Sequence, residues 1–494
     1  MRAMKVVLSL FVVVGLASVV LSNTPGAKNR PASPGETDSL IVHEWGTFTS
    51  ISGSDGVRLE FRPLIDNDLP EFVINRAWQA GRAPSLFLKW SISSFQRMET
   101  PVTYFYTDRE REVSVKVGFP QGLLTEFYPP VATMKPDFNF NKRAEIGNSE
   151  LDWGRVTLIP TSHFRPQVAS LELANLIHDH TLQTIAPASD SHPHYGYARE
   201  TDSAIVHVRR TNVSERPYTP SGDFFEKFLF YRGVGNFSLP LKLTATGSRQ
   251  FELSNDGSDP IRSLFLVTAQ AGEVQFQKYD SIAAGSRLVL EQAITTSSID
   301  DLSQAVAKAL VGEGLFEKEA QAMVKTWRDS WFQEEGTRLF YMLPERLTDE
   351  LLPLTIQPRP DKTVRVMVGR LEIITPEEES RITQIVQTSA RARQEVAVQA
   401  AAVAAALQIA EQQQESKPES KDDARNNVVA TAPPSAPNTE PPAKPKLPEA
   451  LAQMGRLAEP ALARVKYFSK DATVRGEADA LLKEFHEHWK AAGN

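Results

Sequence analysis

The sequence contains no cysteine among its 494 residues. This absence excludes disulfide bonds, thiol nucleophiles, thiolate zinc sites and iron–sulfur clusters. An excess of positive charge is also missing, because 61 acidic and 54 basic residues give a net charge of −7. That balance argues against a nucleic-acid partner, which usually requires a clearly basic surface. The sequence also has no Gly-x-Ser-x-Gly, Walker or His-Glu-x-x-His motif, so the common nucleophile, phosphate and zinc-protease signatures are absent.

Long apolar runs are confined to the N-terminus. Arg2 and Lys5 precede an uncharged, mostly apolar run over residues 6–21, and small residues close that run. This pattern predicts a signal peptide over residues 1–22, followed by a Pro- and Gly-containing flexible tether over residues 23–38. An uncleaved N-terminal anchor is the alternative, and it would be the only membrane contact. In either case we expect the folded part to be exported, to the periplasm or the extracellular space.

From residue 39 onward, short segments rich in Val, Ile, Phe, Tyr and Thr alternate with turn residues. Short strands without long helices between them favour antiparallel sheets. We therefore predict a mainly β protein with one or two antiparallel, immunoglobulin-like β-sandwich domains, over residues 39–204 and 205–299. The sequence leaves open whether the two regions share their sheets. The expected strands are residues 40–51, 57–63, 86–92, 101–107, 112–119, 123–128 and 156–159 in the first region, and 205–209, 227–231, 241–245, 251–254, 264–269, 274–279 and 288–291 in the second.

Helical periodicity interrupts and follows the strands. Residues 168–184 are expected to form a short helix within the first β-rich region. Residues 300–333 have one broad apolar face at helical spacing, with a break expected near Gly312 and Gly314. Strands at 338–342 and 364–375 are expected to close the body, so that residues 300–376 contain helices and closing strands.

The C-terminal part has three segments of different composition. Residues 377–414 begin with three glutamates and continue through an Ala-rich run without Gly or Pro, which predicts one long helix. Residues 415–447 are polar and Pro-rich, which is typical of a disordered linker. Residues 448–494 contain two amphipathic stretches and are expected to form a helical hairpin, which must dock on the long helix, on the β body or on a partner.

Several phrases resemble known sequence groups. HEWGTF at residues 43–48, METPVTYFYT at 98–107 and YARETD at 197–202 resemble a group of uncharacterised exported bacterial proteins. The resemblance implies export but no reaction or cofactor. The phrase around Gly455 and Pro460, followed by a second amphipathic stretch, resembles a single HEAT-type helical repeat, which implies a helical hairpin.

Histidine is the first candidate for chemistry, because five of the nine histidines lie between residues 163 and 194. Two His-x-His pairs occur there, and on a strand the imidazoles of such a pair point to the same face. One pair would supply two ligands of a zinc site or a similar divalent-metal site, with Glu44 or Asp202 as further options. The alternative is an ordinary polar loop exposed to solvent. The candidate metal ligands are His178, His180, His192, His194 and, from the first strand, His43.

Two carboxylates form the second candidate. Glu200 and Asp202 share a face if their segment is extended, and Arg199 then points the other way. Paired carboxylates act as acid and base in glycoside hydrolysis. The alternative, a salt-bridge and turn-capping cluster at the entrance to a strand, is the reading that we favour. A third feature, Trp45, is interpreted either as a flat platform for a sugar ring or as a core aromatic residue.

The sequence does not identify an enzyme. The preferred hypothesis is an exported β-sandwich protein that binds or scaffolds at the cell envelope, with an envelope protein or polysaccharide as partner and no nucleic acid. The second hypothesis is a metal-dependent hydrolase of envelope or extracellular polymers, with its site around residues 178–202. The two differ in one structural expectation: an enzyme should bring His43, the histidine-rich segment and Asp202 together in one pocket.

Overall fold

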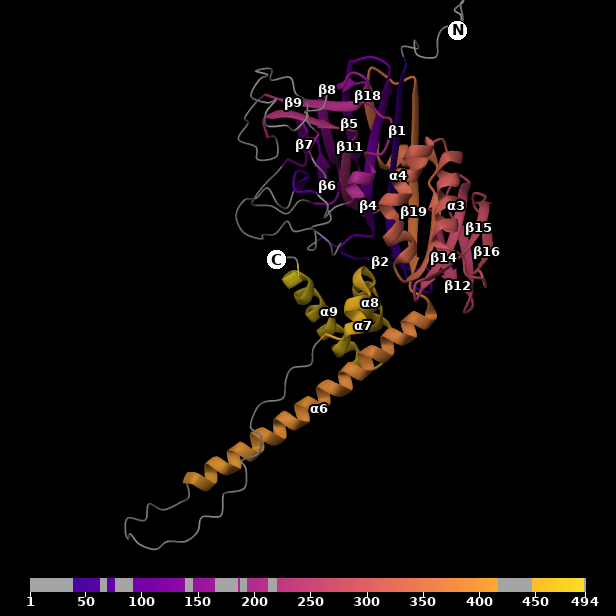
Figure 1. The fold of residues 1–494 in the computed structure, drawn as a ribbon. Helices are drawn as coiled ribbons and strands as arrows, with labels where there is room; N and C mark the ends of the chain where they lie inside the picture. Colours follow the sequence, from indigo (N-terminus) through magenta and orange to yellow (C-terminus); the bar gives the residue numbers. More distant parts are fainter. Residues whose placement is uncertain are drawn as a thin grey trace, which may run out of the picture. The chain divides into compact units, whose positions relative to one another are not determined.

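The computed structural model describes residues 39–62, 69–75, 92–137, 145–164, 185–186, 193–211, 220–415 and 447–492. Within these ranges the protein is mainly β, with several sheets and a helical C-terminal region (Figure 1). The expected signal peptide, tether, short helix at 168–184 and most of the Pro-rich linker lie outside the described residues.

The central sheet contains β1 (Leu40–Ser52) as one of its middle strands. On one side β1 pairs in parallel with β19 (Lys362–Ile373), from Ile41 opposite Lys362 to Ser52 opposite Ile373. The prediction of purely antiparallel sheets is therefore wrong at this pair, and the sheet is mixed. Parallel pairing requires a long connection, and here most of the body separates the two strands in sequence. From one edge of the sheet to the other, the strands are β15 (Glu273–Ile282), β14 (Ile261–Gln270), β17 (Gly336–Met342), β19, β1, β4 (Gln96–Thr107), β11 (Leu229–Gly235), β6 (Gly122–Tyr128) and β3 (Ile74–Asn75). A further short strand, β2 (Arg58–Leu59), pairs with β1.

Two smaller sheets complete the β body. The first, in spatial order, contains β10 (Gly222–Glu226), β9 (Ile205–Arg210), β8 (Ser149–Ile159), β5 (Arg111–Phe119) and β18 (Leu354–Gln357), and β7 (Thr133–Lys135) pairs with β8. The second contains β12 (Leu241–Ala245), β13 (Gln250–Asn255) and β16 (Arg287–Glu291). Strands from residues 39–204 and 205–299 pair with one another, and the latter are distributed over all three sheets. The two predicted β regions therefore share their sheets.

One hydrophobic core joins the three sheets. It contains, for example, Phe48 of the central sheet, Val117 of the second sheet and Leu253 of the third, all essentially buried. The alternating pattern expected for β5 is observed, since Val113, Val115, Val117 and Phe119 are buried while the residues between them are half-buried. Burial of alternate side chains on one face of each strand is what stabilises this arrangement.

A second core lies on the opposite face of the central sheet, under α3 (Ile299–Gly312), α4 (Glu317–Arg328) and the π-helical turn η3 (Asp329–Gln333) (Figure 1). The expected break between the helices is confirmed, and Gly314 has a φ of 109°, which favours glycine. Ser298 caps α3 by accepting a hydrogen bond from the Asp301 N–H, in a capping box. Two further short helices, α2 (Pro193–Tyr197) and α5 (Glu345–Leu351), lie between strands.

The C-terminal region consists of α6 (Pro376–Glu415), α7 (Glu449–Gln453), the 3-10 turn η4 (Gly455–Leu457), α8 (Ala458–Phe468) and α9 (Ala472–Ala492). The expected long helix and C-terminal hairpin are confirmed. A third hydrophobic core joins Ile382 of α6, Leu462 of α8 and Leu481 of α9 to Ile51 of β1. The hairpin thus packs against both the long helix and the β body. Of the described helices, none combines the length and the apolar character that a membrane span requires.

Candidate functional site

Helix α4 contacts most of the described residues that the sequence suggested for chemistry. Four of its side chains take part, and each engages a different partner. These pairs are Lys318 with Asp202, Glu319 with His43, Lys325 with Glu200, and Thr326 with the main-chain carbonyl of His194. The expected residues are therefore brought to one helix, but as separate pairs along its length.

His43 is fully buried beside the start of α4. Its Nδ1 lies 2.7 Å from Oε2 of Glu319, and its ring centroid is 4.4 Å from that of Phe316. Within the described part of the chain, its Nε2 has no hydrogen-bond partner. Aromatic rings and a carboxylate therefore enclose this imidazole, and a substrate from solvent does not reach it.

Glu319 is equally buried and accepts three hydrogen bonds. Besides His43, the Tyr106 hydroxyl donates to Oε1 at 2.6 Å and the Phe316 N–H donates to Oε2 at 2.7 Å. Burial, followed by the Glu319 charge, raises the pKa of Tyr106 well above its ordinary value, so this hydroxyl stays protonated and remains a donor. The hydrogen bonds of Glu319 with His43 and Tyr106 anchor the first turn of α4 to the sheet.

The carboxylates of Glu200 and Asp202 are both exposed and both paired with lysines of α4. Asp202 accepts from Nζ of Lys318 at 2.7 Å, and Glu200 pairs with Lys325. Arg199 points elsewhere and forms a two-point ion pair with the buried Glu226, at 3.0 and 2.7 Å. These contacts are those of a surface salt-bridge cluster. A general acid, by contrast, commonly has its pKa raised by an apolar environment.

The histidine candidates are only partly visible. His178, His180 and His192 lie outside the described residues. His194 lies on α2, half-buried, with its ring centroid 6.4 Å from that of Tyr197. Across the ranges given above, no group of three His, Asp or Glu side chains is arranged to hold a metal ion. Trp45 is fully buried in the core under α4, so the interpretation as a core aromatic residue is confirmed.

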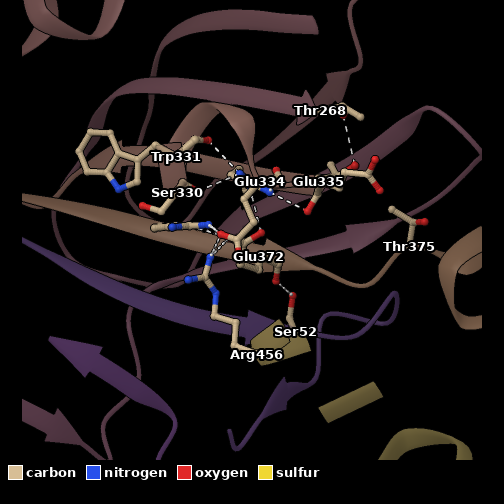
Figure 2. A network of polar contacts seen from close by, with 12 residues as sticks. Ser52, Thr268, Ser330, Trp331, Glu334, Glu335, Glu372, Thr375 and Arg456 are labelled. Carbon is tan, nitrogen blue, oxygen red and sulfur yellow. Dashed lines mark hydrogen bonds and ion pairs between the residues drawn. The ribbon is translucent and has the colours of Figure 1, made fainter. Parts of the chain in front are cut away.

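A network of buried and half-buried charges, which the sequence did not suggest, lies on the helix-covered face of the central sheet (Figure 2). Arg370 and Glu372 are two residues apart on β19 and share this face. Arg338 of β17 donates to Glu372 at 3.1 Å and to main-chain carbonyls of residues 330, 331, 334 and 335. Arg456 of the C-terminal hairpin reaches into the network and contacts both Glu372, at 3.1 Å, and Glu334. We call these five residues the arginine network.

Electrostatics hold the Glu372 carboxyl in its charged form. Burial alone would raise its pKa, but the guanidinium groups of Arg338, Arg370 and Arg456 outweigh burial and lower the pKa below its ordinary value. The same holds for the neighbouring Glu99 of β4, where Arg97 is the main lowering charge. The Thr49 hydroxyl adds a hydrogen bond to Glu99 at 2.9 Å. Buried charges of this kind are stable only when paired in this way.

A second buried ion pair lies on the other face of β1. Arg365 donates to Oε2 of Glu44 at 2.8 and 2.6 Å, and the hydroxyl groups of Thr103 and Tyr231 donate to Oε1 at 2.9 and 2.7 Å. Glu44 and His43 therefore point to opposite faces, as strand alternation predicts. Both carboxylate oxygens of Glu44 accept hydrogen bonds on the face opposite His43, so the two residues do not form one site.

The hairpin is clamped to the body and to α6 by further ion pairs. Arg464 of α8 contacts Asp55 at 3.1 Å and Glu379 at 2.9 Å. Its guanidinium lies against Gly53, where any Cβ would approach it to 2.1 Å. On α6, Arg393 contacts Glu477 at 2.7 Å and Glu484 at 2.6 Å, both on α9. Together with Arg456, these contacts tie the hairpin both to α6 and to several segments of the β body. The ion pairs are Arg456–Glu334, Arg456–Glu372, Arg464–Asp55, Arg464–Glu379, Arg393–Glu477, Arg393–Glu484 and Arg62–Glu459.

A surface hollow of about 600 Å³ lies between β12 and α5. Its charged lining includes Arg346, which pairs with Asp259 and Glu350. Of the candidate histidines and carboxylates that the structure describes, none lines it. The hollow is therefore separate from α4 and from the arginine network.

Comparisons with known proteins give little. No family model matches the chain, and no curated protein matches it. Among solved structures, the yeast delta-COP-I mu-homology domain is similar over 68% of this chain and 97% of that one, at 8% identity and a TM-score of 0.23. The same domain complexed with a Dsl1 WxWxV peptide gives 7% identity and a TM-score of 0.21 over the same shares. Similarity at this level carries no argument about fold or function.

Proposed function

We propose that the protein is an exported binding or scaffold protein of the cell envelope. In this proposal the β body is a rigid mount, and α6 is the element that it presents to a partner. The observation that carries the proposal is the clamp described above. Arg393, Arg456 and Arg464 fix the hairpin and the first half of α6 to the body, while every described side chain from Gln394 to Gln412 is exposed or half-buried.

The state of the candidate catalytic groups supports binding over hydrolysis. A general acid or base must lie within reach of its substrate. His43 and Glu319 are fully buried and bound to each other, whereas Glu200 and Asp202 are paired with lysines. The metal-dependent hydrolase is the second hypothesis, and the described residues contain no feature that favours it.

Other parts of the hypothesis complete the proposal. The shared core between the central sheet and the two smaller sheets supports description of the whole body as a β-sandwich. Export follows from the predicted signal peptide over residues 1–22, and an envelope protein or polysaccharide is the proposed class of partner. The resemblance to exported bacterial proteins and to a HEAT-type hairpin remains a prediction.

The proposal is tested by photo-crosslinking in intact cells that export the full chain. A photoreactive amino acid at Leu407, in the outer half of α6, is expected to give a discrete adduct. The matched control is Val289 on β16, which is 53% exposed but lies outside the presented helix and should give none. Absence of any adduct from position 407 in the exported protein would contradict the scaffold function.

A further inference from the structure

Helix α6 carries a stripe of residues spaced alternately by four and three positions. Such a repeat places every member on one face and is the pattern of a left-handed coiled coil. The stripe consists of Ile382, Val386, Ser389, Arg393, Val396, Ala400, Val403, Leu407 and Ala410. Its first three members are buried against the C-terminal hairpin, and Arg393 is half-buried there. The uncovered part, from Val396 to Ala410, therefore continues an established helix interface without a change of register.

The charge pattern of this uncovered part limits the kind of partner that fits. Between Gln394 and Gln412 only Glu395 and Glu411 are charged, one near each end. Partner choice in coiled coils is usually set by charged residues that flank the stripe, and here those flanking positions hold mostly Ala and Gln. No flanking charges are therefore present to select a different partner helix, whereas an identical stripe can pack against itself.

We propose, on the basis of the scaffold function above, that the outer half of α6 pairs in antiparallel orientation with the same segment of a second copy of this chain. In that register Val396 packs against Leu407 of the other copy. Ala400 packs against Val403 of the other copy, and both layers recur by symmetry. Each small residue lies opposite a larger one, which fills the seam evenly. A two-fold pairing of this kind is closed and yields a dimer.

The position of the hairpin favours the antiparallel over the parallel orientation. The hairpin covers the stripe as far as Arg393, which is held by Glu477 and Glu484 of α9. A parallel pair would bring the two hairpins side by side at one end of the paired segment. The antiparallel pair puts them at opposite ends, about 26 Å apart along the helix axis at 1.5 Å per residue.

The absence of cysteine from the chain makes a direct test possible. Val396→Cys and Leu407→Cys are prepared as two separate full-length proteins and mixed under mild oxidation. If the pair is antiparallel, the mixture should give a disulfide-linked dimer made of one copy of each protein. The yield of disulfide-linked dimer from either protein alone should be at least about five-fold lower. Strong cross-linking of each protein with itself would show a parallel pair and overturn the proposal. The proposal would also be overturned if no cross-link formed and the wild-type protein was a monomer in sedimentation equilibrium at about 100 μM.

A matched pair of variants tests the stripe itself. Replacement of Val396, Val403 and Leu407 by Gln should abolish the dimer in sedimentation. The control replaces Val398 and Ile409 by Gln as well. These residues are 64% and 56% exposed but lie off the stripe, so the dimer should stay intact. Equal loss in both variants would overturn the assignment of the interface. Because the thermal unfolding of the β body is measured in parallel, loss of the fold is separated from loss of pairing. The photo-adduct at position 407 separates this proposal from the scaffold function: a mass of two copies supports self-pairing, whereas an adduct with another envelope protein overturns it and leaves the scaffold function standing.

Discussion

Removal of the Arg456 side chain is expected to release the C-terminal hairpin without unfolding the β body. Arg456 is the hairpin residue that enters the arginine network, and its side chain is only 11% exposed. In Arg456→Ala, the contacts with Glu334 and Glu372 are lost. Glu372 nevertheless keeps Arg338 and Arg370 as partners, so no buried charge is left uncompensated.

The magnitude follows from this difference. Removal of one partner from an isolated buried ion pair costs about 3–5 kcal/mol. Here the remaining arginines still neutralise Glu372, and Glu334 is 35% exposed, so its contact is screened by solvent. We therefore expect a loss of about 2 kcal/mol in hairpin docking, which is roughly a 30-fold change in the ratio of docked to undocked hairpin.

Hydrogen exchange measures this ratio segment by segment. Amide protection in α8 and α9 is expected to fall about 30-fold, while protection in β1 and β19 stays unchanged. The matched control is Lys483→Ala, which removes an exposed charge on α9 that pairs within its own helix, with Asp479 at 2.9 Å. Unchanged protection of α8 and α9 in Arg456→Ala would refute the reasoning, as would an equal loss in the central sheet.

Four further predictions follow from the sequence and the structure. Intact-mass measurement of the exported protein is expected to give a chain that begins at Asn23, and a mass that retains residues 1–22 would indicate an anchor instead. The free energy of unfolding, measured by urea titration, should decrease as the pH falls below about 4.5. The reason is that the pKa of Glu99 and of Glu372 is lower in the folded than in the unfolded chain, so the stabilisation is lost as the folded carboxyls become protonated. A flat profile between about pH 5 and 3 would contradict the importance of the network. Gly369→Ala should lower the free energy of unfolding by about 2 kcal/mol or more, since its Cβ would lie 2.2 Å from the Tyr341 ring, whereas Gly476→Ala in α9, with no atom within 4 Å, should raise helix stability by up to about 1 kcal/mol. The metal hypothesis predicts that zinc raises the melting temperature of the wild type and that His192→Ala with His194→Ala removes this response; a wild type that does not respond to zinc would exclude it.

Local pattern was sufficient to predict most of the elements. Strand alternation located β5, and the glutamates after residue 376 located the start of α6, because both signals depend on neighbours in sequence. The parallel pairing of β1 with β19 was not predictable, since more than 300 residues separate the strands and no turn fixes their direction. Short strands with weak patterns, such as β7 and β18, were missed for a related reason: their pairing partner, not their own sequence, makes them strands.

The candidate site divides in the same way. The sequence pointed to Glu200 and Asp202 as a salt-bridge cluster, and their lysine partners on α4 agree with that reading. The arginine network was missed because its members come from β19, from the hairpin, from β17 and from the segment just before β17. Only Arg370 with Glu372, and Glu334 with Arg338, are close in sequence. A strand that carries two opposite charges on its buried face is the one local signal that could have indicated it.

The parallel pairing of β1 with β19 has a mechanical consequence. Only Ile374 and Thr375 separate the end of β19 from α6, and β1 is the first described strand after the N-terminal segment. Tension between the N-terminus and α6 would therefore pull β1 from its beginning and β19 from its end, along the strand direction. In this geometry the hydrogen bonds of the twelve aligned residue pairs, from Ile41–Lys362 to Ser52–Ile373, resist together in shear instead of opening one after another. Force applied between these two points would thereby pass through two strands that are paired over twelve residues.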